Sequence, residues 1–98
     1  METRESCDMI RQPNEEACLD GPPGSYFFDV AESGQRRLWF VLPNGHAGVI
    51  NIRPVVAGAE AHPSWEWNGD EVRVILTPSV HCIGTWHGWF TAGRMVSC

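Results

Sequence analysis

Turn-forming residues interrupt this chain at short intervals beyond residue 24, and the runs between them are rich in β-branched and aromatic side chains. Pro43-Asn44-Gly45, Asn68-Gly69 and Thr91-Ala92-Gly93 are combinations typical of hairpin loops. About seven short strands at this spacing indicate a small antiparallel β-barrel or β-sandwich. We therefore expect a mostly β fold, with one β domain over residues 25–98. The expected strands cover residues 26–30, 37–42, 47–53, 64–67, 72–76, 86–90 and 94–97, with a short extended piece at 80–83.

The stretch from His62 to Phe90 is the densest in aromatic side chains and holds four of the five Trp residues. Ser64-Trp65-Glu66-Trp67 alternates, which places both Trp rings on one face of a strand. Asn68-Gly69 is the strongest two-residue hairpin signal in the chain, so residues 72–76 are expected to return as the partner strand.

Residues 1–24 differ from the rest of the chain and are expected to form an acidic N-terminal arm. The first 35 residues carry eight acidic residues and two Arg, and the arm ends in the breaker Gly21-Pro22-Pro23-Gly24. Within the arm, Thr3 to Arg11 is predicted to form a short helix that Pro13 ends.

The net charge of −5 argues against a nucleic-acid-binding surface, which is normally basic. It suits a protein partner with a basic surface instead. The sequence shows neither an apolar membrane span nor a signal-peptide pattern, so a cytoplasmic location is expected, with no membrane partner.

One His/Cys spacing suggests a metal. Four residues separate Cys82 from His87, and a thiolate with an imidazole suits zinc. Further ligands would come from His46, His62 or Cys98 if the strand ends converge. The alternative is structural, with Cys82 as a small buried side chain and His87 as a hydrogen-bonded histidine.

Four Trp residues are candidates for ligand binding. Trp65, Trp67, Trp86 and Trp89 would offer stacking surfaces to a carbohydrate or a nucleobase. The alternative is that they form the core, which is the commoner fate of large aromatics in a small β domain.

No complete catalytic site is recognisable, so no catalytic residue is assigned and the chain is expected not to be an enzyme. Cys82 and His87 would suit a nucleophile and a base, but the spacing singles out no third group to orient them. Ser64 and Ser79 lie next to prolines, outside any nucleophile-elbow motif.

The pattern HPSWEWNGD, then LTPSV, then a Cys followed by WHGWFTAGRM, resembles a family of small phage and prophage proteins built on a domain of unknown function. Some of its members carry the label "ammonia monooxygenase". The resemblance covers about residues 36–98 and implies a phage or prophage origin. Many of these relatives have a Cys-rich knuckle after their first Leu-Trp-Phe strand, which implies zinc. Here the matching turn keeps His46 but lacks the cysteines.

Together, these observations predict a phage-encoded, non-catalytic binding module that acts on a host or phage protein in the host cytoplasm. Two alternatives stay open: a zinc-stabilised structural module, and a Trp-lined domain that binds a carbohydrate or a nucleobase.

Overall fold

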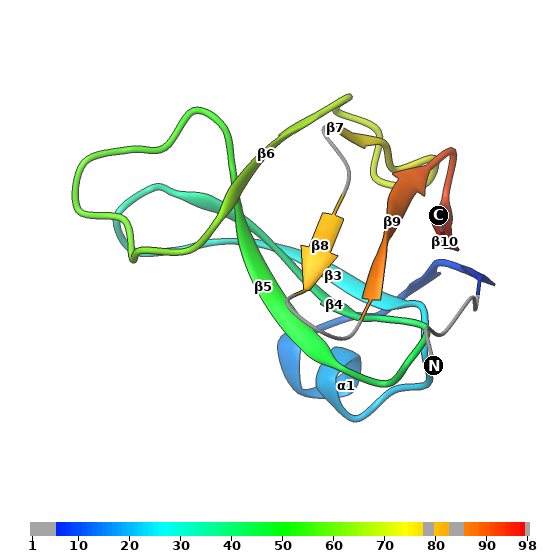
Figure 1. Cartoon of the computed structure of the whole chain (residues 1–98). Coiled ribbons are helices and arrows are strands. Elements are labelled where there is room, and N and C mark those ends of the chain that lie inside the picture. Colours follow the sequence, from blue (N-terminus) through cyan, green and yellow to red (C-terminus); the bar gives the residue numbers. More distant parts are fainter. Residues whose placement is uncertain (1–5, 78–79, 83–85, 98) are drawn as a thin grey trace.

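The computed structural model describes residues 6–77, 80–82 and 86–97, with residues 80–82 described by their backbone only. The expected mostly β fold is confirmed: strands dominate these ranges, with one short helix (Figure 1). The strands are β1 (Cys7–Asp8), β2 (Ile10–Arg11), β3 (Ser25–Val30), β4 (Arg36–Val41), β5 (Ala47–Ile52), β6 (Ser64–Trp67), β7 (Leu76–Thr77), β8 (Val80–Cys82), β9 (Trp86–Thr91) and β10 (Arg94–Ser97), and the helix is α1 (Glu15–Leu19).

The strands form two sheets. One has six strands in the order β2-β3-β4-β5-β6-β7, and the other has four in the order β1-β10-β9-β8. Most pairs are antiparallel, as expected, but β2 with β3 and β5 with β6 are parallel. The parallel β5–β6 pair requires the long connection of residues 53–63, which projects to the left in Figure 1.

One hydrophobic core joins the two sheets. Phe40 of β4 and Phe90 of β9 meet edge to face, with ring centroids 5.3 Å apart. Both rings are almost fully buried, and burial of each removes apolar surface worth about 1.5–3 kcal/mol from water. Other buried members of the core include Leu38, Ile50 and Met95, so both sheets contribute.

Strand β9 has strict two-residue alternation. Trp86, Gly88 and Phe90 are buried, while His87, Trp89 and Thr91 are exposed. Gly88 allows close packing here, because a Cβ at this position would lie 2.2 Å from the carbonyl oxygen of Val96 and 2.6 Å from the Trp86 ring. The outward-facing side chains of β9 are therefore fixed to a tightly packed strand.

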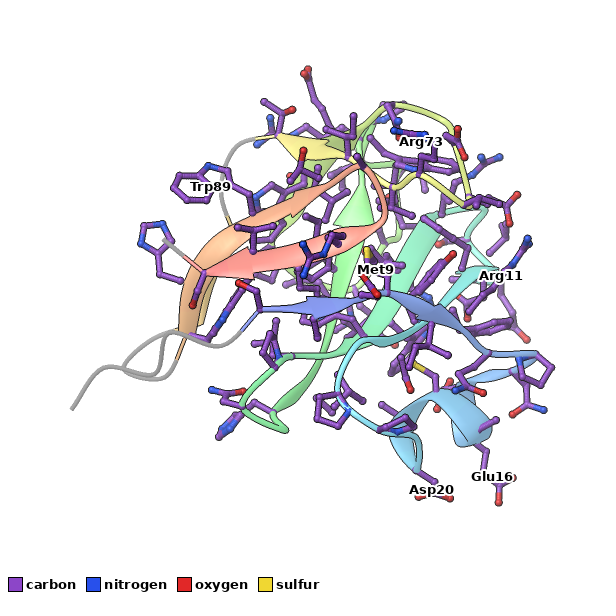
Figure 2. The ribbon with its side chains drawn as sticks, turned by 90° about the vertical axis from the view of Figure 1, so that its right-hand side faces the viewer. Met9, Arg11, Glu16, Asp20, Arg73 and Trp89 are labelled. Atoms are coloured by element: carbon purple, nitrogen blue, oxygen red, sulfur yellow. The ribbon has the colours of Figure 1, made fainter. Side chains whose placement is uncertain are left out.

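The N-terminal segment corrects the helix that was expected over residues 3–11. Residues 7–11 form β1 and β2 rather than a helix; Thr3 lies outside the described residues. β1 pairs with β10 and β2 with β3, and Figure 2 shows the blue strand β1 running beside β10. The helix begins later, where Asn14 accepts a hydrogen bond from the Ala17 amide (2.8 Å), and it buries Cys18. The described part of the expected arm is thus built into the fold.

The Asn68-Gly69 hairpin is also wrong in its length. β6 pairs with β7 through Trp67 and Leu76, so residues 68–75 form one wide loop. Two side chains hold this loop: Asn68 Oδ1 accepts from the amides of Asp70 and Ile75, and Asp70 Oδ1 accepts from those of Val72 and Arg73. These hydrogen bonds from the main chain to side chains take the place of the strand-to-strand hydrogen bonds that would follow a two-residue turn.

The other two hairpins are confirmed, although the second has a two-residue loop where the three residues Thr91-Ala92-Gly93 were expected. Residues 42–46 join β4 to β5, and Ala92-Gly93 joins β9 to β10. Ala92 and Gly93 both have positive φ (49° and 79°), as the two central residues of a type I′ turn require. Within the described ranges, no helix has the length and apolar character needed to cross a membrane.

Candidate functional site

Strand β9, which pairs with β8, carries an exposed histidine, His87. In the antiparallel register Val80 lies opposite Gly88, His81 opposite His87, and Cys82 opposite Trp86. The imidazole of His87 is exposed on the outer face of β9, and the Trp89 ring stacks beside it at 6.4 Å between centroids. Trp89 is 45% exposed, and Figure 2 shows it projecting from this strand.

An apolar groove adjoins this face of the molecule. Its volume is about 500 Å³, and β7, β9 and β10 supply most of its walls. It is lined by Ile75, Leu76, Thr77, Trp89, Phe90, Thr91 and Val96. None of these side chains is charged, so the groove suits an apolar group better than an ionised one. Trp89 therefore both lines the groove and stacks beside the imidazole of His87.

A second histidine lies beside a carboxylate and a serine. His62 Nε2 is 3.2 Å from Glu60 Oε2, and Ser64 follows two residues later at the start of β6. In a catalytic triad, Nε2 faces the serine and the carboxylate holds Nδ1. Here Nε2 faces the carboxylate, and Ser64 Oγ accepts a hydrogen bond from Arg53 Nε (3.1 Å). This geometry does not suit His62 as a base for Ser64.

The predicted metal ligands are spread over the fold. His46 is on the β4–β5 turn, His62 precedes β6 and His87 is on β9, and no three His, Cys, Asp or Glu gather among the described side chains. The backbone of Cys82 lies opposite Trp86, not opposite His87. The side chains of Cys82 and Cys98 lie outside the described part of the chain, so a zinc site there stays a prediction.

The four Trp candidates have different surroundings. Trp86 is buried in the core at 2% exposure, whereas Trp89 is exposed. Trp65 and Trp67 are half-buried against the core. Trp67 also stacks on Phe28, with ring centroids 4.5 Å apart. Trp89 is therefore the most open of the four, and binding of a sugar or nucleobase by them stays a prediction.

Comparison with known proteins identifies one family. The sequence model of BubE, described as "Bacterial ubiquitination-like system serine protease", matches residues 13–98. No curated protein and no solved structure matches the chain.

This match overturns the sequence-based identification. The chain was expected to be a phage or prophage protein of unknown function, and that assignment is wrong because the family is one of bacterial proteases. The expectations of a non-catalytic binding module, of no enzyme and of a zinc-stabilised structural module fall with it. The expectations of no enzyme and of a non-catalytic module rested on the lack of a local catalytic motif, which a site assembled from separate strands does not need. Since the match spans most of its length, the chain belongs to the BubE family of bacterial ubiquitination-like system serine proteases.

Proposed function

We propose that this protein is a serine protease that cleaves a protein substrate in a bacterial ubiquitination-like system. The observation that carries the proposal is the family match over residues 13–98. The exposed His87 on β9, next to an apolar groove, supports it, because a protease needs an accessible base and a place for the substrate chain.

His87 is the base in this proposal. General-base chemistry needs an imidazole that a substrate can approach, and His87 meets this requirement on the outer face of β9. His62 is held through Nε2 by Glu60. His46 lies on the β4–β5 turn, and neither of the strands that this turn joins carries a serine. The side chain of His81 lies outside the described part of the chain.

Ser79 is the serine that we assign as nucleophile. The described serines of residues 13–98 fit this role less well. Ser25 is fully buried and donates to the Pro22 carbonyl (2.7 Å), Ser33 lies on the β3–β4 turn, and Ser64 accepts from Arg53. Ser97 pairs with Gly88 across β10 and β9, so both lie on the face of the sheet opposite to His87.

The assignment of Ser79 itself rests on the sequence, because this residue lies outside the described part of the chain. Ser79 directly precedes β8, and His81 of that strand is paired with His87 of β9. A nucleophile near the start of β8 would therefore be carried by the strand next to the proposed base.

The proposed reaction is acyl transfer in two steps. Ser79 Oγ attacks the carbonyl carbon of the scissile bond while His87 accepts the hydroxyl proton. His87 then gives this proton to the leaving amine, and the substrate's acyl group stays on Ser79 as an ester. Water hydrolyses the ester with His87 again as base, which restores the hydroxyl. The groove beside Trp89 would hold an apolar side chain of the substrate.

The setting of the reaction is also part of the proposal. A cytoplasmic location suits a component of an intracellular modification system. A basic surface on the protein substrate would complement the net charge of −5.

A serine-directed fluorophosphonate probe tests the proposal without knowledge of the substrate. We expect stoichiometric labelling of Ser79 by mass spectrometry, no labelling of Ser79→Ala, and labelling of His87→Gln slowed by about 10³-fold or more. Ser64→Ala and His62→Gln are the matched controls and should label at the wild-type rate. Labelling that survives Ser79→Ala but disappears in Ser64→Ala would place the nucleophile at Ser64 and overturn the assignment.

A further inference from the structure

The apolar groove beside β9 lies where the two sheets meet. Its walls on the side of the six-stranded sheet are residues 75–77, which include the edge strand β7. Its walls on the side of the four-stranded sheet are residues 89–91 of β9 and Val96 of β10. β7 and β9 are neighbours in space although they belong to different sheets (Figure 1). The shape of the groove therefore depends on how firmly each side is held.

Hydrogen bonds fix the side of the groove that follows the loop of residues 68–75. Ile75 is bonded twice to Asn68, because its amide donates to Asn68 Oδ1 and its carbonyl accepts from the Asn68 amide, both at 3.2 Å. The neighbouring Val74 carbonyl accepts from the Gly93 amide (3.2 Å), which ties this loop to the β9–β10 turn. Both sides of the groove are thus held in place by the fold itself.

The described walls of the groove favour a large apolar ligand. Two large apolar side chains stay exposed in it, Trp89 at 45% and Ile75 at 37%, and the hydrophobic effect favours covering them. A volume of about 500 Å³ lies within the roughly 300–1,000 Å³ typical of ligand sites. A charged side chain would lose its hydration here without gaining a charged partner from these walls.

The groove and His87 are close enough to act on one segment of substrate. His87 and Trp89 are two residues apart on the outer face of β9, which corresponds to a rise of roughly 6.7 Å. Consecutive Cα atoms of a polypeptide are about 3.8 Å apart. A side chain in the groove therefore belongs to a residue within about two positions of the peptide bond that lies beside His87.

We infer that this groove is the specificity pocket of the protease, and that it takes an aromatic or leucine-sized side chain on the acyl side of the scissile bond. The inference rests on the proposed function and adds to it a substrate class and two specificity-determining residues, Ile75 and Trp89. The acyl side is favoured because this part of the substrate stays on the serine as an ester. A pocket for its side chain therefore positions the substrate in both steps of the reaction.

Diphenyl phosphonate probes of the form acetyl-Ala-Ala-Xaa, in which the phosphonate replaces the carbonyl of Xaa, test the inference on the wild-type chain. The serine oxygen bonds to phosphorus and phenol leaves with the hydroxyl proton, so the rate of labelling in mass spectra reports how well Xaa fits. Probes with Leu or Phe as Xaa should react about tenfold or more faster than the probe with Ala, and the probe with Glu no faster than that with Ala.

Two other outcomes separate the inference from the proposed function. If the Ala probe reacts as fast as the Leu and Phe probes while the small fluorophosphonate still labels Ser79, the groove is not the specificity pocket and the protease proposal stands. If neither the phosphonates nor the fluorophosphonate label the chain, the proposed function fails and the inference fails with it.

Two variants locate the pocket. Thr91→Lys places a positive charge in the groove from an exposed position, so it should slow the Leu probe and speed the Glu probe severalfold. Ile75→Ala removes an exposed wall and should lower the Leu-to-Ala rate ratio severalfold; an unchanged ratio would overturn the assignment of Ile75. Ser33→Lys is the matched control, since it adds the same charge on the exposed β3–β4 turn, which does not line the groove. If Ser33→Lys speeds the Glu probe as much as Thr91→Lys does, general electrostatic attraction and not this groove sets the preference.

Discussion

Replacement of Gln35 by Met measures how strongly one buried side chain holds the β3–β4 turn to the β5–β6 loop. Met is unbranched and close to Gln in shape, so it keeps the packing and removes the three side-chain hydrogen bonds to Arg36, Ile52 and Val56. Each buried hydrogen bond contributes about 1 kcal/mol net, which gives a loss of about 3 kcal/mol. That is a large part of the roughly 5–15 kcal/mol by which small proteins are stable.

Urea unfolding followed by Trp fluorescence measures this loss. We expect the midpoint of Gln35→Met to fall by roughly 1–3 M with an unchanged slope, since slopes for small proteins are about 1–3 kcal/mol/M. Gln12→Met is the matched control, because Gln12 makes a single side-chain hydrogen bond, to Ser25 Oγ at 3.2 Å. If Gln35→Met costs no more than Gln12→Met, Gln35 does not tie the two segments together as the structure indicates.

Three further substitutions test other parts of the structure. Gly88→Ala should destabilise the protein by several kcal/mol in the same urea assay, as the new Cβ would meet the Val96 carbonyl; wild-type stability would refute this packing. Ala92→Asn should stabilise it by about 0.5–1 kcal/mol, because Asn tolerates positive φ better than Ala; a loss of stability would contradict the turn. Burial, aided by the Glu15 carboxylate, raises the pKa of Cys18 from 9.0 to about 11. The native state then keeps a proton that the unfolded chain loses, so stability should decline between pH 9 and 11, and Cys18→Ala should reduce this decline in urea midpoints.

The parts of the fold that local chemistry determines were predictable from the sequence. The strand at 86–90 and the hairpins after residues 42 and 90 depend on neighbours in the chain, and the structure confirms them. The loop after Asn68 was not predictable from the Asn-Gly pair alone. Its form depends on Asp70, whose carboxylate caps the amides of Val72 and Arg73; these bonds also lower the pKa of Asp70.

Longer-range features could not be predicted in this way. Residues 7–11 are strands because β10 and β3 provide their partners, and nothing near them in the sequence indicates this. The same holds for the proposed site. His87 was recognisable as a reactive side chain, but only the β8–β9 register shows which segment lies beside it. Ser79 was not chosen from the sequence because no nucleophile-elbow motif surrounds it. The position of Ser79 directly before β8, the strand that pairs with the His87 strand β9, is the feature that favours it in the proposal.

The pairing of β1 with β10 has a consequence for the growing chain on the ribosome. Cys7 lies opposite Met95, and the Ser97 amide donates to Ser6 Oγ (3.0 Å), so the first and last described strands are neighbours. The four-stranded sheet can close only after β10 has emerged, about 90 residues after β1, and such distant pairings make folding slow. Because β9 lies in the middle of that sheet, His87 reaches its final position only once residues 94–97 have been synthesised. A nascent chain that has not yet reached β10 is therefore expected to lack the proposed proteolytic activity.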